Sequence, residues 1–442
     1  MKNGVIDGML HSLVQGGRAL AGRSPQRAAA SLCGLCEVLL SSRGEASGVA
    51  LAQEILDRWK LLPLQARHAF LLMLAQQFGP DPDRLHQAIH QFRKRPGPLT
   101  GVELHAAAEP RRQELFRRFN LAPGGTATLV ALRQELLAIM EENPDLEALD
   151  HDLQHLLASW FNRGFLTLRR IDWSTPANVL DKVIRYEAVH TIRDWHDLRR
   201  RLQPADRRCF AFFHPQLVDE PLIFVEIALT DHIPASIDAV LAEERSPIAP
   251  ERATTAVFYS ISNCQEGLRG ISFGNFLIKQ VVEDLKRELP KLDTFVTLSP
   301  MPGFAAWLKA ARGKSSGEVL DDEKRAALGA IDPAGWQQDA RVAEQIKKTL
   351  LAAGATYLVR AKGSSGKPVD PVARFHLGNG ARLERINFLG DLSPKGLAQS
   401  HGLMVNYLYR IEDIEENHEA YASKGTVVAA KTVLRLARAV PS

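Results

Sequence analysis

A serine stands at the end of a short apolar run, Thr294–Leu298, which has the character of a buried strand. Ser299 follows the run, and it is held between the strand and a turn. Pro300 and Pro302 cannot continue a central β-ladder, and Gly303 allows the backbone to turn. Strand ends are where α/β proteins often place chemistry. The pattern therefore indicates either a rigidly held reactive hydroxyl or a strand that simply stops.

Three glycines separate a predicted strand from a predicted helix. The strand ends near Ser262, and Gly267, Gly270 and Gly274 precede the helix. Glycines at a helix N-terminus let backbone N–H groups approach an anion closely, and the helix dipole adds partial positive charge there. The stretch lacks the ending of a Walker A loop and the spacing of a dinucleotide site. It indicates either a phosphate-bearing ligand or an ordinary turn.

A histidine with no nearby metal-ligand partner lies between two large apolar residues. His376 follows Phe375 and precedes Leu377, so we expect it to be half buried. Such a histidine is either an acid–base group or a satisfied core residue. Tyr409 lies downstream on a segment that is expected to be buried, where a tyrosine usually finds a hydrogen-bond partner. Core packing is the alternative role for that tyrosine.

The elements that must position these residues fall into two halves. From about residue 6 to 161, apolar residues recur at intervals of three and four, which predicts helices. From Gly164 onward, short apolar runs alternate with helical segments, which predicts a mixed sheet with helices packed on it. The predicted strands are FLTLRRI, CFAFF, PLIFVEIALT, TAVFYSIS, DTFVTLSP and RLERINFL. The predicted helices of this half are 177–187, 193–202 and 273–289, with more from 321 to 358.

Bulk composition excludes several classes of protein. The 442 residues are 45% hydrophobic and carry a net charge of +4, too small and dispersed to indicate nucleic-acid binding. The chain has no run of about 20 apolar residues, so no membrane span is expected. The N-terminus shows no convincing secretion signal. Four cysteines without zinc spacing predict reduced, packed thiols in a cytoplasmic protein, with no metal site.

The glycine turn is similar to the Q/R-x-x-G-x-G/A signature of the GNAT acetyltransferase superfamily. Gln265, Gly267 and Gly270 occupy its positions, with Arg269 inside it. In that fold the turn holds the pyrophosphate of coenzyme A, and the following helix leads to a strand that ends near the acyl group. The resemblance implies that Ser299 lies where a thioester would bind.

A longer set of motifs resembles the malonyl-CoA decarboxylase family. The motifs occur in order between about residues 155 and 425. They are FYSIS (258–262), QEGLRG (265–270), GNFLIKQVVEDLKRELPKL (274–292), LSPMPGF (298–304), FHLGNGARLERIN (375–387) and GLMVNY (402–407). The resemblance implies a fold of class α+β, with an N-terminal all-helical oligomerisation domain (1–162) followed by a GNAT-like mixed-sheet α/β catalytic domain (163–442). It also implies a homodimer or homotetramer.

The resemblance assigns roles to particular residues. It implies that Ser299 and His376 are catalytic, that Tyr409 lies near the histidine, and that Ser260 supports them. The residues expected at malonyl-CoA and its coenzyme A part are Gln265, Gly267, Arg269, Gly270, Ser272, Gly274, Pro300 and Gly303. One position departs from the pattern, because some members carry glutamate where this chain has Ser272. Glu266, or no acid at all, would have to serve instead.

The implied reaction converts malonyl-CoA to acetyl-CoA and CO2 through an enolate. The thioester delocalises the electrons of the breaking bond, so we expect no metal and no cofactor besides the coenzyme A of the substrate. Two other functions remain open: a GNAT-fold acyltransferase, and a non-catalytic protein that binds coenzyme A thioesters. A hydrolase that uses Ser299 and His376 is disfavoured, because no GxSxG elbow surrounds the serine.

Overall fold

The computed structural model describes residues 24–41, 44–271, 277–313, 322–333 and 335–438. Contacts within the chain group these residues into two compact units. The first unit takes in the chain up to Leu166 together with His214–Val218 and the described part of Gln265–Phe273. The second unit takes in Thr167–Phe213, Asp219–Cys264 and the described residues from Leu277 onward. No helix among the described residues is both long and apolar enough to cross a membrane.

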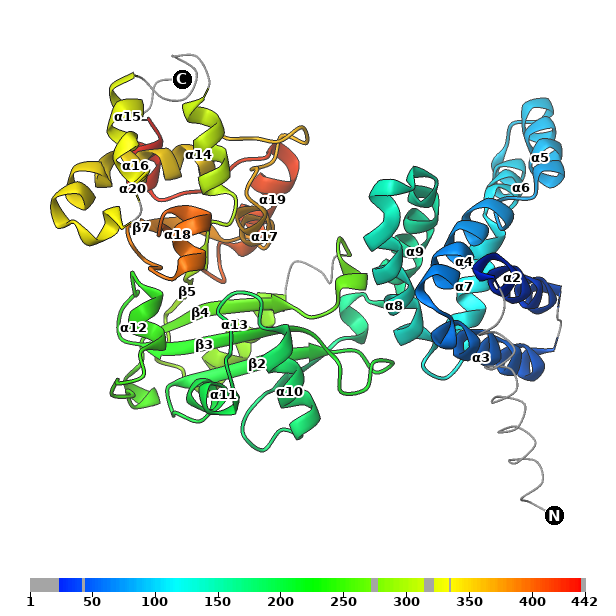
Figure 1. Ribbon diagram of the computed structural model, residues 1–442, viewed down its shortest axis with the longest axis horizontal. Helices are drawn as coiled ribbons and strands as arrows, with labels where there is room; N and C mark the ends of the chain where they lie inside the picture. The colour runs from blue at the N-terminus through cyan, green and yellow to red at the C-terminus, as the bar shows by residue number, and fades with distance from the viewer. Residues whose placement is uncertain (1–23, 42–43, 272–276, 314–321, 334, 439–442) are drawn as a thin grey trace. The chain divides into compact units, whose positions relative to one another are not determined.

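The first unit is built from helices, as the periodicity predicts (Figure 1). They are α2 (Pro25–Ser41), α3 (Glu45–Leu61), α4 (Leu64–Gln77), α5 (Pro82–Lys94), α6 (Pro98–Ala108), α7 (Arg111–Leu121), α8 (Gly125–Ile139) and α9 (Glu147–Trp160). Leu32, Phe70, Phe116 and Leu153 come from four of these helices, and all are buried in the core. Helices stabilised by an apolar face need such packing, because isolated helices of this length are marginal in water.

The second unit contains a mixed sheet. Its strands are β1 (Thr167–Arg170), β2 (Arg207–Phe213), β3 (Pro221–Thr230), β4 (Thr255–Asn263), β5 (Thr294–Thr297), β6 (Ser299–Pro300), β7 (Arg382–Asn387) and β8 (Met404–Tyr409). They lie in the order β1-β2-β3-β4-β5-β8-β6, and β7 also pairs with β8. Every strand predicted from the sequence is present. Pro300 does join the pairing, opposite Met404, but only in a two-residue strand at the end of the order.

The described part of the second unit also contains helices. They are α10 (Ala177–Tyr186), α11 (Trp195–Leu202), α12 (Ile237–Leu241), α13 (Leu277–Glu288), α14 (Phe304–Arg312), α15 (Asp322–Ala327), α16 (Ala340–Val359), α17 (Pro371–Gly378), α18 (Pro394–Ser400), α19 (Ile414–Lys424) and α20 (Lys431–Arg438). Helices α10 and α11 pack on β2 and β3 around Leu180, Val183, Leu198 and Phe224 (Figure 1). The predicted fold class, a helical region followed by a mixed-sheet region, is confirmed.

The pairing of the strands positions Ser299 and Tyr409 in the second unit. Strands β4 and β5 are parallel, which requires a crossover, and α13 lies in that connection. Strand β8 then pairs antiparallel with both β5 and β6. This pairing sets Tyr409 opposite Phe295 and Val405 opposite Ser299. Segments far apart in the sequence thus meet where β5 ends.

Candidate active site

Ser299 and His376 meet inside the second unit. Ser299 begins β6, directly after the end of β5, and His376 lies on α17. The Oγ atom of Ser299 is 3.0 Å from the Nε2 atom of His376 and 2.9 Å from the Oγ1 atom of Thr297. Both catalytic candidates are buried. The structure therefore brings together two residues that are 77 positions apart in the sequence.

The expectation that His376 is half buried is wrong, because its side chain is only 3% exposed. The histidine lies on a short helix whose N-cap, Asp370, accepts a hydrogen bond from the backbone N–H of Ala373. The ring of Tyr407 stacks on the imidazole at 4.6 Å between centroids. Burial disfavours the imidazolium and lowers the pKa of His376 to about 3, so the ring is neutral near pH 7.

Tyr409 contacts the other nitrogen of the same imidazole. Its hydroxyl is 2.8 Å from the Nδ1 atom of His376. Burial raises the pKa of Tyr409 well above its usual value, so the phenol keeps its proton. A phenol that donates to Nδ1 leaves the imidazole proton on Nε2, the nitrogen that faces Ser299. The serine hydroxyl then donates to Thr297, which completes one consistent chain of donors and acceptors.

Sequence reasoning missed two residues of this group. Thr297 precedes Ser299 by two positions, and Tyr407 precedes Tyr409 by two. Residues two apart on a strand point to the same face, so this spacing was the available signal. Thr297 also accepts a hydrogen bond from the backbone N–H of Tyr407 at 3.1 Å, which ties β5 to β8 beside the serine.

A cavity of about 240 Å³ opens onto the pair. Its walls are mostly apolar, and they come from the segment after α10, from β4, from β6 and from α17. The lining residues are Val189, Phe258, Tyr259, Ile261, Asn263, Ser299, Pro300, Pro371, Val372, Phe375 and His376. The predicted site residue Pro300 is thus part of the wall. A small, largely apolar cavity around a serine–histidine pair suits a compact acyl group.

Gly303 lies against a buried tyrosine and does not line this cavity. A Cβ atom at this position would lie 2.5 Å from the hydroxyl oxygen of Tyr357. That hydroxyl donates to Asp370, the N-cap of the helix that carries His376, at 3.0 Å. Because Gly303 has no side chain, the loop after Ser299 can pack against Tyr357, and Tyr357 holds the N-cap of the helix that carries His376.

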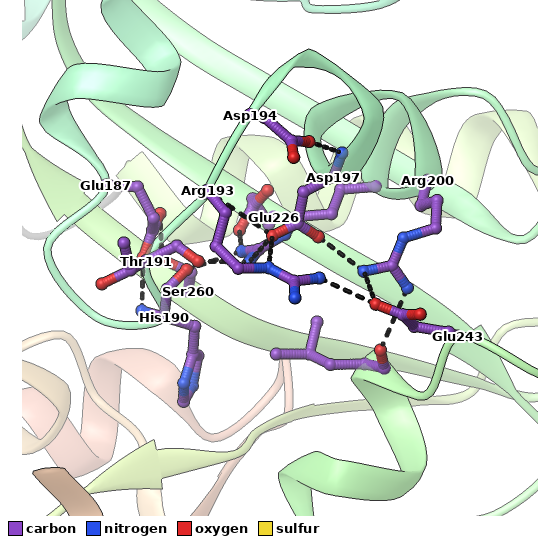
Figure 2. Close-up of polar contacts among 12 residues, drawn as sticks. Glu187, His190, Thr191, Arg193, Asp194, Asp197, Arg200, Glu226, Glu243 and Ser260 are labelled. Carbon is purple, nitrogen blue, oxygen red and sulfur yellow. Dashed lines mark hydrogen bonds and ion pairs between the residues drawn. The ribbon is translucent and has the colours of Figure 1, made fainter. Parts of the chain in front are cut away.

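Ser260 lies on β4 but is not among the residues that line the cavity. Its hydroxyl bonds to both carboxylate oxygens of Glu187 at 2.8 Å (Figure 2). Glu187 was missed by sequence reasoning, and no local signal could have found it, because the two residues are 73 positions apart. Among the described residues, the hydroxyl of Ser260 bonds to Glu187 and is 3.3 Å from that of Ser262, and no hydrogen bond joins it to Ser299 or His376.

The glycine turn belongs to the first unit. A Cβ atom on Gly267 would lie 1.9 Å from the carbonyl oxygen of Val130 on α8, so this position must be glycine for packing. Arg133, also on α8, donates to the carbonyl of Gly267 at 2.8 Å and pairs with Asp150. Gly270 has a φ of +82°, a conformation that favours glycine.

The other residues expected at this turn are placed as follows. Gln265 is half buried, whereas Glu266 and Arg269 are exposed on either side of the tight turn. Ser272 and Gly274 lie outside the described residues. Within the described ranges, no group of three histidine, cysteine, aspartate or glutamate side chains is arranged to hold a metal ion. The four cysteines are buried and unpaired.

A mixed-sheet unit that buries a neutral histidine against a serine at the wall of a small cavity is an arrangement that can carry out acid–base chemistry on a small acyl group. Comparison with known proteins gives the family. The model of the malonyl-CoA decarboxylase C-terminal domain matches residues 164–441, and that of the N-terminal domain matches residues 78–161. This chain therefore belongs to the malonyl-CoA decarboxylase family, whose members are carboxy-lyases.

Individual relatives agree with this assignment. The mitochondrial malonyl-CoA decarboxylase of Anser anser anser is 36% identical over 415 residues, which cover 86% of this chain and 82% of that protein. The crystal structure of malonyl-CoA decarboxylase from Rhodopseudomonas palustris is 59% identical, covers 92% of this chain and 99% of that one, and superimposes with a TM-score of 0.89. The enzyme from Agrobacterium vitis is 58% identical, with 92% and 99% coverage and a TM-score of 0.88.

Proposed function

We propose that this chain converts malonyl-CoA and a proton to acetyl-CoA and CO2 at the Ser299–His376 pair. The observation that carries this proposal is the 3.0 Å contact between the two side chains at the wall of a small cavity, in a chain of this family. Ser299 and His376 bind the malonyl head by hydrogen bonds. They hold the carboxylate so that the breaking C–C bond is perpendicular to the thioester plane.

Loss of CO2 leaves an enolate, which must be stabilised and then protonated at the α-carbon. The buried imidazole is neutral, so the proton that it offers is the N–H of Nε2, passed directly or through the hydroxyl of Ser299. A proton from solvent then restores that N–H, which accounts for the one proton that the reaction consumes. Tyr409 supports this by its bond to Nδ1. Apolar walls formed by Phe258 and Phe375 favour the step, because the charge of the carboxylate becomes dispersed as CO2 leaves.

The coenzyme A part of the substrate is proposed to bind through the turn at Gly267–Gly270. Arg269 and Gly270 are exposed there, and the guanidinium group of Arg269 suits a pyrophosphate. The thioester itself delocalises the electrons, so the proposed reaction uses no metal and no organic cofactor. We also propose a cytoplasmic location and a homodimer or homotetramer assembled through the helical region, although the curated relative from Anser anser anser is named as mitochondrial.

Product analysis tests the reaction. Purified wild type with malonyl-CoA is expected to form acetyl-CoA and CO2 in equal amounts, measured by mass spectrometry. Ser299→Ala and His376→Ala are each expected to lower kcat by at least about 100-fold, the usual cost of removing a group that acts on the transition state. Release of free coenzyme A would instead indicate a hydrolase, and binding without turnover would indicate a thioester-binding protein. Transfer of an acetyl group to an amine or alcohol would indicate an acyltransferase.

A further inference from the structure

The segment that follows α10, residues 188–190, forms part of the cavity wall without belonging to a helix or strand. Val189 lines the same cavity as Ser299 and His376. The backbone N–H groups of this segment donate to side chains. That of Ala188 donates to Ser262 Oγ at 3.2 Å, and those of Val189 and His190 donate to Glu187 Oε1 at 2.8 and 2.7 Å. Side chains therefore take the place of a regular backbone ladder.

Side chains also satisfy the carbonyl groups of the segment. Lys395 Nζ donates to the carbonyls of Ala188 and Val189 at 2.6 and 3.1 Å. Arg201, which is buried on α11, donates to the carbonyl of His190 at 2.8 Å and to that of Thr191 at 3.0 Å. Every N–H and C=O group of residues 188–190 thus has a side-chain partner, from the buried Glu187, Ser262 and Arg201 and from the exposed Lys395.

Glu187 accepts hydrogen bonds both from this segment and from β4, and Figure 2 shows it beside His190 and Ser260. The residue is 8% exposed, and its carboxylate accepts from two backbone N–H groups and from two serines of β4. Ser260 reaches both oxygens at 2.8 Å, and Ser262 reaches Oε2 at 3.2 Å. A buried carboxylate is costly unless its oxygens are fully hydrogen-bonded, and here four donors meet it. The arrangement fixes the segment to strand β4.

We propose that Glu187 is a positioning residue for the decarboxylation site. It holds residues 188–190 so that Val189 closes the cavity around the acyl group, and Ser260 acts on the reaction through Glu187. The inference rests on the proposed function and deepens it. It also gives Ser260 a role in the reaction although this serine does not line the cavity. Displacement of the wall by about 1 Å is enough to cost on the order of 100-fold in rate when reacting groups are mispositioned.

Two variants test the role. In Glu187→Gln, the amide NH2 replaces one acceptor with donors that face other donors. In Ser260→Ala, one donor is lost with less disturbance. Both are expected to lower kcat/KM for malonyl-CoA, by about 10- to 100-fold and about 5- to 20-fold respectively. The products are expected to remain acetyl-CoA and CO2 in equal amounts. Ser260→Thr keeps the hydroxyl and is expected to restore most of the rate.

The preference of each variant for malonyl-CoA over a bulkier substrate distinguishes a misplaced cavity wall from a general loss of structure. Malonyl-CoA and its 2-methyl derivative differ by one methyl group, which a tight wall discriminates by roughly 10- to 200-fold. Glu187→Gln, Ser260→Ala and Val189→Ala are all expected to relax this ratio by about threefold or more. The matched control is Asp206→Asn, which removes the charge of another buried carboxylate in the same unit. Asp206 pairs with Arg245 and does not line the cavity. This variant is expected to leave the ratio unchanged.

The outcomes are distinguishable. An unchanged ratio in both Glu187→Gln and Ser260→Ala, or an equal change in Asp206→Asn, would overturn the positioning role while the wild type still decarboxylates. If the wild type itself forms no acetyl-CoA and CO2, the proposed function fails, and the positioning role fails with it. Failure of Glu187→Gln to fold leaves Ser260→Ala and Ser260→Thr to decide, because their difference is a single hydroxyl on the carboxylate.

Discussion

At the scale of single residues, the site depends on which nitrogen of His376 carries the proton. The imidazole is neutral and enclosed, with Tyr409 at Nδ1 and Ser299 at Nε2. A neutral imidazole offers one N–H and one lone pair, and its neighbours decide which nitrogen has which. Tyr409 therefore has a defined task in the proposed reaction, which is to keep the proton on the nitrogen that faces the serine.

Tyr409→Phe tests this task. Loss of the hydroxyl leaves Nδ1 without its donor and lets the imidazole proton move to that nitrogen, so kcat is expected to fall by about 10- to 100-fold. The matched control is Tyr407→Phe, because the hydroxyl of Tyr407 has no hydrogen-bond partner among the described residues. Its ring would still stack on His376, and kcat is expected to change by less than about threefold. Equal losses in the two variants, measured by steady-state kinetics, would contradict the assignment.

His376 also makes stability depend on pH. Its folded pKa of about 3 lies below the value of roughly 6.5 expected in the unfolded chain, because burial disfavours the charged ring. The unfolded state therefore binds a proton that the native state excludes, and the free energy of unfolding falls as the pH drops from about 6.5 toward 3.

Denaturant unfolding at pH 7 and pH 5 measures this contribution. The wild type is expected to lose more stability between these two values than His376→Gln, by up to about 2 kcal/mol. The comparison with the variant is needed because His190, whose pKa burial lowers to about 4, destabilises the native state over the same range. An identical loss in the two proteins would show that His376 is not held neutral by burial.

At the scale of elements, helix α8 supports the turn that is proposed to bind coenzyme A. Arg133 holds the carbonyl of Gly267, and the backbone of the turn touches Val130 where a side chain would collide. Arg133 is 1% exposed and paired with Asp150, so its charge is compensated and its position fixed. Packing against helix α8 therefore explains the glycine at position 267, whereas the motif alone indicated that this glycine lets the backbone come close to a phosphate group.

Gly267→Ala should force the turn away from α8. We expect a loss of about 1–3 kcal/mol in the free energy of unfolding, as for other overpacked sites, together with a higher KM for malonyl-CoA. Gly34→Ala is the matched control, because it makes the same change in α2 with open space around the new Cβ atom. That control should stabilise the protein by about 0.5–1 kcal/mol, since alanine is the better helix former. Similar effects of both changes in chemical denaturation would argue against packing as the cause.

At the scale of the whole molecule, the two compact units do not follow the order of the chain. Residues His214–Val218 and the described part of Gln265–Phe273 lie in the half expected to be catalytic, yet they pack within the helical unit. His214 Nε2 is 3.1 Å from the carbonyl of Trp160, and its ring lies 4.6 Å from that of Phe161. The predicted boundary after residue 162 stays a prediction, and these two segments cross it.

Expression of residues 163–442 alone tests whether these two segments need the N-terminal helices in order to fold. Removal of the helices takes away the packing partners of both segments, so the fragment is expected to aggregate or to melt at least about 5 °C below the full chain. Any folded fragment is expected to bind malonyl-CoA more weakly, because the proposed coenzyme A turn loses Arg133. Size-exclusion chromatography, thermal unfolding and steady-state kinetics give the answer. A monodisperse fragment with the melting temperature and kcat/KM of the full chain would refute this dependence.

The sequence by itself determined the local features of this protein and its family. Apolar residues at intervals of three and four predicted the helices, and short apolar runs predicted the strands, because side chains follow a different period in each kind of element. A strand that ends before prolines and glycine located Ser299, and ordered motifs indicated the family. Only the tertiary structure decided which residues that are distant in the sequence come into contact. The contacts of Ser299 with His376, of Glu187 with Ser260 and of Arg133 with Gly267 depend on strand register and helix packing. These are set by the burial of many side chains at once, and no short stretch of sequence contains them.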